Sequence, residues 1–359
     1  MSEFAATLIG LSNVRTASPT RVARGADPDT APGLRERLYT HALRALEGRE
    51  AFIHDAVIFG RRVRLYSNSH HLADFWRDNW WTEAEWRSRT GALVPREPEI
   101  SVYAVIHVGP EPEASYVSAA RNEVYVFNTS YYGDLRACAL EALRSRVVAE
   151  ADLYHGAGVA LGDRGLLLVY PKEVIHPTPG WGLLELPEAR FLGDGWVAVD
   201  RRGRLHGLEK GAYVRTSFVE SYPGYAAKFL FAKFENVPDP TPAVLDAAEP
   251  VASRVFEEAL RNDPRRSLQA LTPERGHEFV ARLVSSRDAR ALVDPHTLLG
   301  RARVLRGPAA LAAAYFLRPG PGEPVRAATH GRLECPCFEV HLGSVPGHPR
   351  EVARLIVRQ

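Results

Sequence analysis

The stretch HGAGVALGDRGLLL, residues 155–168, places two apolar runs on either side of a glycine-marked turn. The first run covers residues 158–161, the turn covers residues 162–165, and the second run continues to residue 170. Short continuous apolar runs bounded by turn residues are typical of buried strands. The stretch therefore predicts a hairpin of two strands that belong to the core of the protein.

The chain beyond this hairpin predicts both strands and helices. ARFLGDGWVAVD, residues 189–200, contains another apolar run, and a glycine-marked turn after it leads on to Tyr213 and Val214. A proline-rich connection, ENVPDPTP, follows at residues 235–242. After it, helical periodicity predicts helices over residues 243–260, 268–284 and 309–317. The chain closes with a possible strand at 338–342 and a terminal helix from Pro349.

Residues 34–150 predict a separate α+β domain that precedes this unit. The predicted elements are a helix at 34–46, strands at 51–59 and 62–67, a helical pattern at 69–86, strands at 99–108, 114–117 and 123–127, and a helix at 135–148. Residues 1–33 include the run VRTASPTRVARGADPDTAP, which has no aromatic residue and no hydrophobic period. We expect them to form a mobile leader.

Composition limits the classes of function. The 359 residues are 45% hydrophobic and 25% charged, which is typical of a globular protein of about two domains. The net charge is only +2, with Arg interleaved with Asp and Glu, so no nucleic-acid role is predicted. No apolar run approaches the ~20 residues that span a bilayer, and we expect no membrane association. Three cysteines are an odd number and too few for a disulfide framework, which predicts a reduced compartment, the cytoplasm.

Two stretches, HGAGVALGDRGLLL and ARFLGDGWVAVD, resemble the strand–turn–strand lead-in and the metal-binding strand of the HPr kinase / PEP carboxykinase-like family. AYVRTSF (212–218), FENVPD (234–239) and ALVDPHTLLG (291–300) are similar to other segments of that family, so the resemblance spans much of residues 50–359. It implies an α/β fold. The expected architecture is an HPr kinase/PEP carboxykinase-like nucleotide-binding core at residues 151–359, with the α+β N-terminal domain before it and a helical C-terminal portion.

The phosphate-binding loop is where the chain departs from this family. The family's G-P-x-G-x-G-K-S-T, laid without gaps on YPKEVIHPT at residues 170–178, retains only Pro171 and Thr178. His176 stands at the position of the phosphate-binding Lys and Pro177 at that of the metal-coordinating Ser. Side chains at the glycine positions obstruct close backbone approach, and Pro177 removes a backbone N–H. Each change opposes phosphate binding.

The resemblance also implies site residues. Asp194 would be the metal-binding and catalytic carboxylate, although Gly195 follows it where the family has a second Asp. His155 would lie beside the nucleotide as a catalytic residue. Lys172, His176, Thr178 and Arg215 would contact the nucleotide. Several of them also fit a purely structural role. His155 and Asp194 could be packed or turn residues, Arg215 an ion-pair partner, and His176 a solvated side chain.

Three functions are left open by these residues. The leading hypothesis is a catalytically lapsed kinase-like protein that binds a partner or ligand through the retained scaffold. The second is an active ATP-dependent kinase that phosphorylates a Ser residue or a small hydroxylated metabolite, with Lys172 or Arg215 as its cation; only this one calls for ATP and Mg²⁺ as cofactors. The third is a structural subunit of a larger assembly.

Two further segments carry residue types that are common in binding sites. FWRDNWWTEAEW, which begins at Phe75 and ends at Trp86, has more Trp residues than one buried helix face needs, and we expect it to contact a protein partner. Cys335 and Cys337, with His341 and His348 downstream, lack the paired C-x-x-C spacing of zinc sites, so no metal is predicted there.

Overall fold

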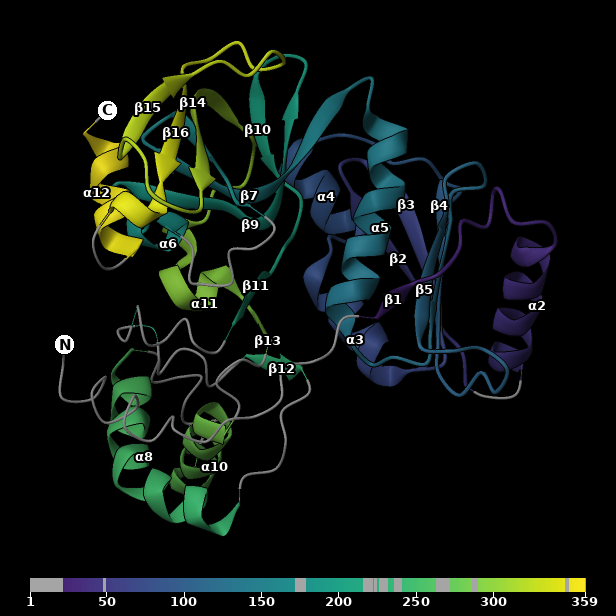
Figure 1. Cartoon of the computed structure of the whole chain (residues 1–359). Helices are drawn as coiled ribbons and strands as arrows, with labels where there is room; N and C mark the ends of the chain where they lie inside the picture. The colour runs from purple at the N-terminus through teal and green to yellow at the C-terminus, as the bar shows by residue number, and fades with distance from the viewer. Residues whose placement is uncertain are drawn as a thin grey trace.

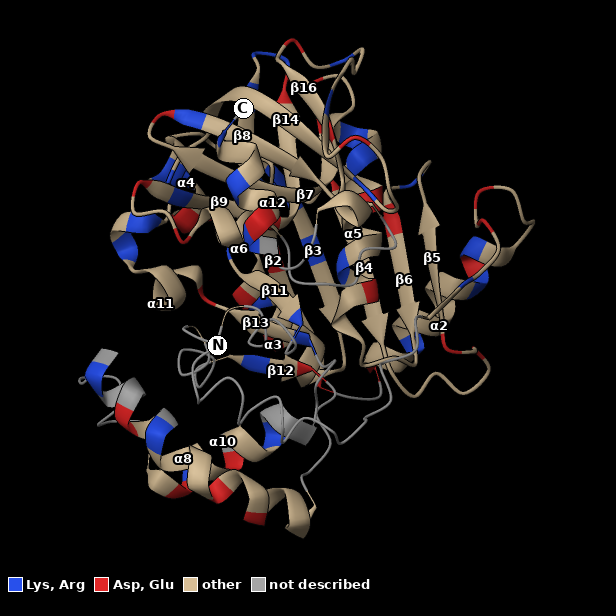
Figure 2. Ribbon diagram, turned by 60° about the vertical axis from the view of Figure 1, so that its left-hand side comes forward, with Lys and Arg blue, Asp and Glu red and all other residues tan. Residues whose placement is uncertain are grey.

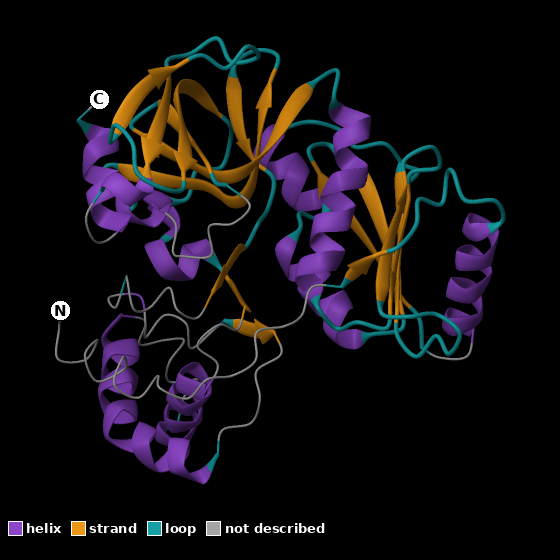
Figure 3. Ribbon diagram, in the orientation of Figure 1, coloured by secondary structure: helices purple, strands orange, loops and turns teal. Residues whose placement is uncertain are grey.

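The structure is a computed structural model of the chain, and it describes residues 22–47, 50–171, 179–215, 222, 225, 232–235, 241–262, 272–285, 290–345 and 349–358. These residues form a mixed α/β protein with three sheets (Figures 1 and 3). Lys and Arg are interspersed with Asp and Glu over the molecule (Figure 2), as expected from the balanced composition. No helix among the described residues is long and apolar enough to cross a membrane.

The first sheet has six strands in the order β1-β5-β6-β4-β3-β2. Their bounds are β1 (Ala23–Arg24), β2 (Phe52–Ile58), β3 (Arg61–Ser67), β4 (Ile100–Val105), β5 (Ala114–Ser118) and β6 (Glu123–Phe127). The predicted strands of the N-terminal domain are thereby confirmed. β2 and β3 form the expected hairpin, whereas β3–β4 and β4–β6 pair in parallel.

The expected leader is corrected for the residues after 21. β1 pairs with β5 in parallel, and the Asp29 carboxylate accepts hydrogen bonds from the Ser118 hydroxyl (2.5 Å) and the Ala120 backbone N–H (2.9 Å). Val22 N–H also donates to Asp134 Oδ2, and Arg24 pairs with Glu141. Composition does not predict these contacts, because backbone pairing and polar side chains, with no apolar period, hold the segment on the sheet. Residues 1–21 lie outside the described residues.

Helices cover both faces of this sheet (Figure 1). α2 (Leu34–Glu47) packs on one face, where Tyr66, Tyr103, Tyr125 and Tyr116 stand side by side on β3, β4, β6 and β5. α3 (His70–Asn79) and α5 (Tyr132–Val147) cover the other face. Helices were predicted at all three places.

The tryptophan-rich segment forms two helices. α3 ends at Asn79, and α4 (Glu83–Thr90) begins after a capping box in which Thr82 and Glu85 exchange side-chain and backbone hydrogen bonds. The two helices turn their indoles inward: Trp76, Trp80 and Trp81 are buried, and Trp86 is half-buried. Three of the four rings that we expected to serve a partner therefore lie in the core, and a partner contact through this segment stays a prediction.

The second sheet has seven strands in the order β10-β9-β7-β8-β14-β16-β15. Their bounds are β7 (Ala151–Leu161), β8 (Arg164–Val169), β9 (Ala189–Asp200), β10 (Arg204–Gly207), β14 (Ala309–Arg318), β15 (Val325–Ala328) and β16 (Cys337–His341). An additional pairing of β10 with β14 closes the first five strands into a small barrel. Leu167, Leu192, Leu205 and Phe316 form an apolar cluster among these strands. The predicted hairpin is β7–β8, and the strand at 189–200 is β9.

The prediction of a helix at residues 309–317 is wrong. This stretch is β14, which pairs in parallel with both β8 and β16. A strand that is buried on both faces reads as one continuous apolar run, and periodicity does not separate such a run from a buried helix. The small residues also suit a strand: a Cβ at Gly165 on β8 would lie 2.9 Å from the Ala310 carbonyl oxygen.

The C-terminal portion is accordingly mixed and not simply helical. Its helices include α8 (Pro242–Asn262), α10 (Pro273–Ser285), α11 (Pro295–Leu299) and α12 (Pro349–Val357), and α8, α10 and α12 confirm the predictions where those fall on described residues. The third sheet joins β11 (Ala212–Arg215), β13 (Arg290–Val293) and β12 (Lys233–Glu235). The short helix α6 (Pro179–Leu183) lies between β8 and β9 in sequence.

Candidate functional site

Asp194 lies on β9, opposite Ala157 of β7, and its residue is only 6% exposed. The indole N–H of Trp181, on α6, donates a hydrogen bond to Asp194 Oδ2 at 2.8 Å. Trp181 is itself buried and packs against the Phe191 ring at 5.7 Å and the Tyr225 ring at 6.0 Å. The carboxylate that the sequence singled out is therefore covered by an aromatic side chain.

Burial raises the pKa of Asp194 to about 6, because desolvation disfavours the charged carboxylate. The hydrogen bond from Trp181 and the positive charge of Arg136 act in the opposite direction and offset part of this increase. Two neighbours thus stabilise the anion of this buried carboxylate. Asp194 is a buried polar group of the interior, and its local contacts are those of a satisfied carboxylate.

Gly195 occupies the position at which the family resemblance implied a second carboxylate. Its φ is +99°, in the region that L-residues with a side chain rarely adopt. A Cβ placed on it would lie 1.9 Å from Arg136 Nη2, which is far inside van der Waals contact. The guanidinium of Arg136 therefore fills the space into which a side chain at residue 195 would project.

Arg136 is held there by Glu209. It belongs to α5, and both Nε and Nη2 donate to the Glu209 carboxylate as a bidentate pair. Arg136 is 8% exposed and Glu209 is 2% exposed. Burial opposes the charge of Arg136, but the Glu209 carboxylate more than offsets it, so the pKa of Arg136 is raised. Such a pair is strongly charge-assisted and geometrically specific.

The same pair connects the first sheet's helices to the second and third sheets. Asn79, at the end of α3, donates from Nδ2 to Glu209 Oε1 at 2.8 Å. The Arg136 guanidinium also lies over the Tyr213 ring of β11, 5.2 Å from its centroid. We call Asn79, Arg136, Asp194 and Glu209 the junction cluster.

A further buried acid lies next to the junction cluster. Glu235, on β12, is 0% exposed and accepts hydrogen bonds from the Tyr132 backbone N–H and the Tyr213 hydroxyl. Burial raises the pKa of Glu235 to about 8, against the lowering effects of the hydrogen bond from Tyr132 and the charge of Arg290. This carboxyl is therefore predominantly protonated at neutral pH.

The other predicted site residues are only partly brought together. His155 lies on β7, opposite Trp196 of β9, and makes edge-to-face contacts with the Trp196 ring at 5.5 Å and the Tyr170 ring at 6.0 Å. It is thus on the strand next to Asp194. Arg215 ends β11 in the third sheet, opposite Arg290. Lys172, His176 and Thr178 lie outside the described residues.

Sequence reasoning missed Arg136, Glu209 and Glu235. Arg136 carried a signal, because it stands four residues after Tyr132 and four before Leu140, on the buried face of α5. A charge on such a face needs a buried partner. Glu209 and Glu235 carried no comparable signal, since Glu209 follows β10 outside regular structure and Glu235 belongs to a three-residue strand.

The donors in the described part of the chain do not fit a metal ion. They include no group of three His, Cys, Asp or Glu side chains that could hold one. Mg²⁺ demands near-octahedral oxygen ligands and usually keeps several waters, whereas Asp194 offers a single dehydrated carboxylate between an indole and a guanidinium. Cys335 and Cys337 are free thiols, and Cys337 Sγ donates to the Cys335 carbonyl oxygen at 3.3 Å.

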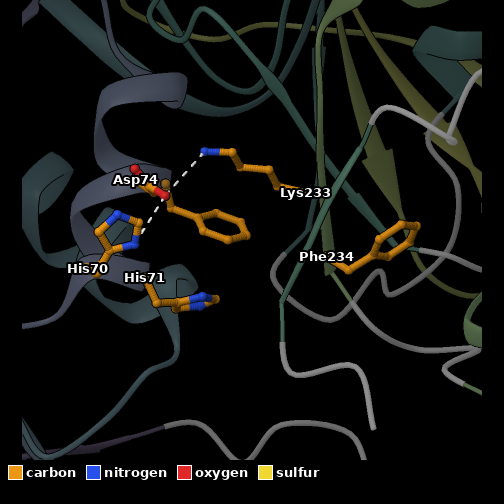
Figure 4. Close-up of a pocket in the computed structure, with 6 residues that line it drawn as sticks. His70, His71, Asp74, Lys233 and Phe234 are labelled. Carbon is orange, nitrogen blue, oxygen red and sulfur yellow. Dashed lines mark ion pairs between the residues drawn. The ribbon is translucent and has the colours of Figure 1, made fainter. Parts of the chain in front are cut away.

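A pocket of about 520 Å³ opens between α3 and β12 (Figure 4). It is lined by His70, His71, Asp74 and Phe75 of α3 and by Lys233 and Phe234 of β12. None of these residues was predicted as a site residue, although Phe75 begins the tryptophan-rich segment. Comparison with known proteins finds no matching family model and no matching curated protein.

Proposed function

We propose that this chain is a catalytically lapsed HPr kinase/PEP carboxykinase-like protein that binds a partner or ligand through its retained scaffold. One observation carries the proposal: the Arg136 guanidinium occupies the space that a second carboxylate at residue 195 would need. A cation fixed by a buried partner at that place would repel Mg²⁺ and would leave no room for the missing ligand.

The surroundings of Asp194 support the same conclusion. Phosphoryl transfer relies on positioned charges and on metal ions that bridge the phosphates, with little covalent chemistry from the protein. Asp194 is dehydrated, and one of its oxygens accepts the Trp181 indole N–H. For Asp194 to bind a hydrated metal ion, Trp181 would have to leave the core in which it packs.

The order of elements favours the kinase-like scaffold. The hairpin β7–β8 precedes a short helix, α6, and the strand that carries Asp194 follows and pairs with β7. The order of the hairpin and the Asp194 strand agrees with the lead-in and the metal-binding strand that the resemblance implies, whereas α6 between them is not part of that resemblance. The departures are concentrated at the residues that would contact metal and phosphate, which is why binding without catalysis is the function we favour.

Isothermal titration of the full chain with Mg-ATP tests the proposal. We expect no binding tighter than millimolar. Micromolar binding that Asp194→Asn abolishes would overturn it and would favour an active ATP-dependent kinase acting on a Ser residue or a small hydroxylated metabolite. Asp163→Asn, in the exposed turn after β7, is the matched control and should change nothing.

A further inference from the structure

Arg89, in the last turn of α4, is a half-buried cation. Its guanidinium lies over the ring of the buried Trp81, 4.0 Å from the ring centroid. It forms no hydrogen bond or ion pair with any residue that the structure describes. A cation–π contact holds a guanidinium over the ring face and does not occupy its N–H groups. The hydrogen-bond donors of Arg89 are therefore not used by the described part of the protein.

Arg306, an exposed residue in the segment before β14, supplies a second positive charge at the same place. Burial and, after it, the charge of Arg306 lower the pKa of Arg89 to about 10, whereas the charge of Glu85 raises this pKa in part. Arg306 likewise forms no hydrogen bond or ion pair with a described residue. Two guanidinium groups from distant parts of the chain thus repel each other, with no carboxylate bound to either of them.

The carboxylates of α4 are already engaged by other cations. Lys210 Nζ donates to Glu85 at 3.2 Å. Glu83 pairs with Arg62 at 2.6 Å and with Arg87 at 2.7 Å. Neither carboxylate is left over to neutralise the two unpaired guanidinium groups. The surface between α4 and the segment before β14 therefore keeps an excess of positive charge.

A phosphate group suits two such guanidinium groups better than a carboxylate does. A phosphate monoester carries a charge of about −1.5 to −2 near pH 7 and has three strong acceptor oxygens. Arginine presents its N–H groups as a planar fork that matches phosphate oxygens in pairs. Two forks can therefore share one phosphate, and its second negative charge offsets the second guanidinium.

We propose that Arg89 and Arg306 together bind the dianionic phosphate group of a small molecule, while Trp81 holds the Arg89 guanidinium from one face. The inference gives a ligand class to the binding role proposed above, and it rests on that role. It requires no metal ion and uses none of the residues of the junction cluster. The two proposals can therefore be tested on the same protein with different ligands.

Inorganic phosphate and acetate are suitable probes, because phosphate is mainly a dianion at pH 8 and acetate is a monoanion. Isothermal titration of the full chain without Mg²⁺, with chloride used to match the ionic strength, measures both affinities. We expect phosphate to bind with a Kd on the order of 1 mM, as is ordinary for so small a ligand. Acetate should bind at least about fivefold more weakly, since it carries half the charge. Equal affinities, or no phosphate binding at tens of millimolar, would overturn the inference.

Three variants locate the site. Arg89→Met keeps an aliphatic contact with Trp81 and removes the guanidinium, so phosphate should bind at least about tenfold more weakly. Arg306→Gln should weaken phosphate binding at least about fivefold. Arg301→Gln is the matched control, because it removes the same charge from another exposed residue, and it should change the affinity less than about twofold.

Equal weakening by Arg306→Gln and Arg301→Gln would show a response to net charge alone and would also overturn the inference. This comparison involves exposed residues only, so it decides the matter if Arg89→Met does not fold.

The failures of the two proposals are distinguishable. Micromolar Mg-ATP binding that Asp194→Asn abolishes, together with phosphate binding that depends on Arg306, would refute the lapsed kinase alone. Absence of phosphate binding, together with no Mg-ATP binding tighter than millimolar, would refute the phosphate site alone.

Discussion

Gly195→Ala is the substitution that most directly tests the junction cluster. A non-glycine residue at φ +99° costs about 1–2 kcal/mol from backbone strain. The added Cβ would also lie 1.9 Å from Arg136 Nη2, and it would have to displace the guanidinium from Glu209. Breaking a buried ion pair costs about 3–5 kcal/mol, which brings the expected destabilisation to about 4–7 kcal/mol.

The loss of unfolding free energy expected for Gly195→Ala is large compared with the total stability of a protein, which is typically about 5–15 kcal/mol. Equilibrium unfolding in urea, followed by tryptophan fluorescence, measures it. Gly203→Ala is the control, because Gly203 also has a positive φ (+68°) but its Cβ would meet nothing within 4 Å. It should lose only about 1 kcal/mol.

The two variants should therefore differ by about 3 kcal/mol or more. A second comparison isolates the contact: in an Arg136→Met background, Gly195→Ala should lose little beyond its backbone strain. If Gly195→Ala and Gly203→Ala destabilise the protein equally, the guanidinium is not fixed beside residue 195. In that case the central support for the lapsed site is lost.

Three other perturbations follow from the structure. Trp181→Phe removes the hydrogen bond that stabilises the Asp194 anion, so the pKa of Asp194 should rise above about 6, as measured by NMR titration of its carboxyl carbon. Glu235 has a folded-state pKa of about 8, above the ordinary glutamate value of 4.5, so its contribution to stability is present below pH 4.5 and is lost as the pH rises through 8. Glu235→Gln cannot ionise and should lose less unfolding free energy than the wild type between pH 6 and 9; an identical loss would assign that pH dependence to other groups. Thr82→Ala removes a capping box from α4 and should cost about 1 kcal/mol in urea unfolding, whereas an unchanged midpoint would show that α4 does not depend on its cap.

The elements that could be predicted from the sequence are those with a local signal. β2, β3, β7 and β9 lie between turn residues, and α5 has a clear helical period. β14 could not be assigned correctly, because its identity is determined by β8 and β16, which lie on either side of it and are distant in sequence. A local pattern does not contain that information.

The sequence singled out Asp194 and Gly195 but not the residues that surround them. The sequence shows that Gly195 follows Asp194, and it cannot show that a residue 59 positions earlier fills the space. Arg136 stands on another sheet's helix, and Glu209 comes 14 residues after Gly195. Arg136 and Glu209 come into contact only when the chain folds, and a local sequence pattern does not predict a contact between residues so distant in sequence.

Placing a second carboxylate beside Asp194 would therefore require more than one substitution. Gly195→Asp alone would bring its side chain into the Arg136 guanidinium and strain the backbone at φ +99°. Removing Arg136 to make room would leave Glu209, at 2% exposure, as a buried carboxylate without its cation. Neutralising Glu209 as well would leave Asn79 as its side-chain partner among the described residues. The Arg136 side chain that fills this space also holds α5 against the second and third sheets, so the local stability of the junction opposes a metal site beside Asp194.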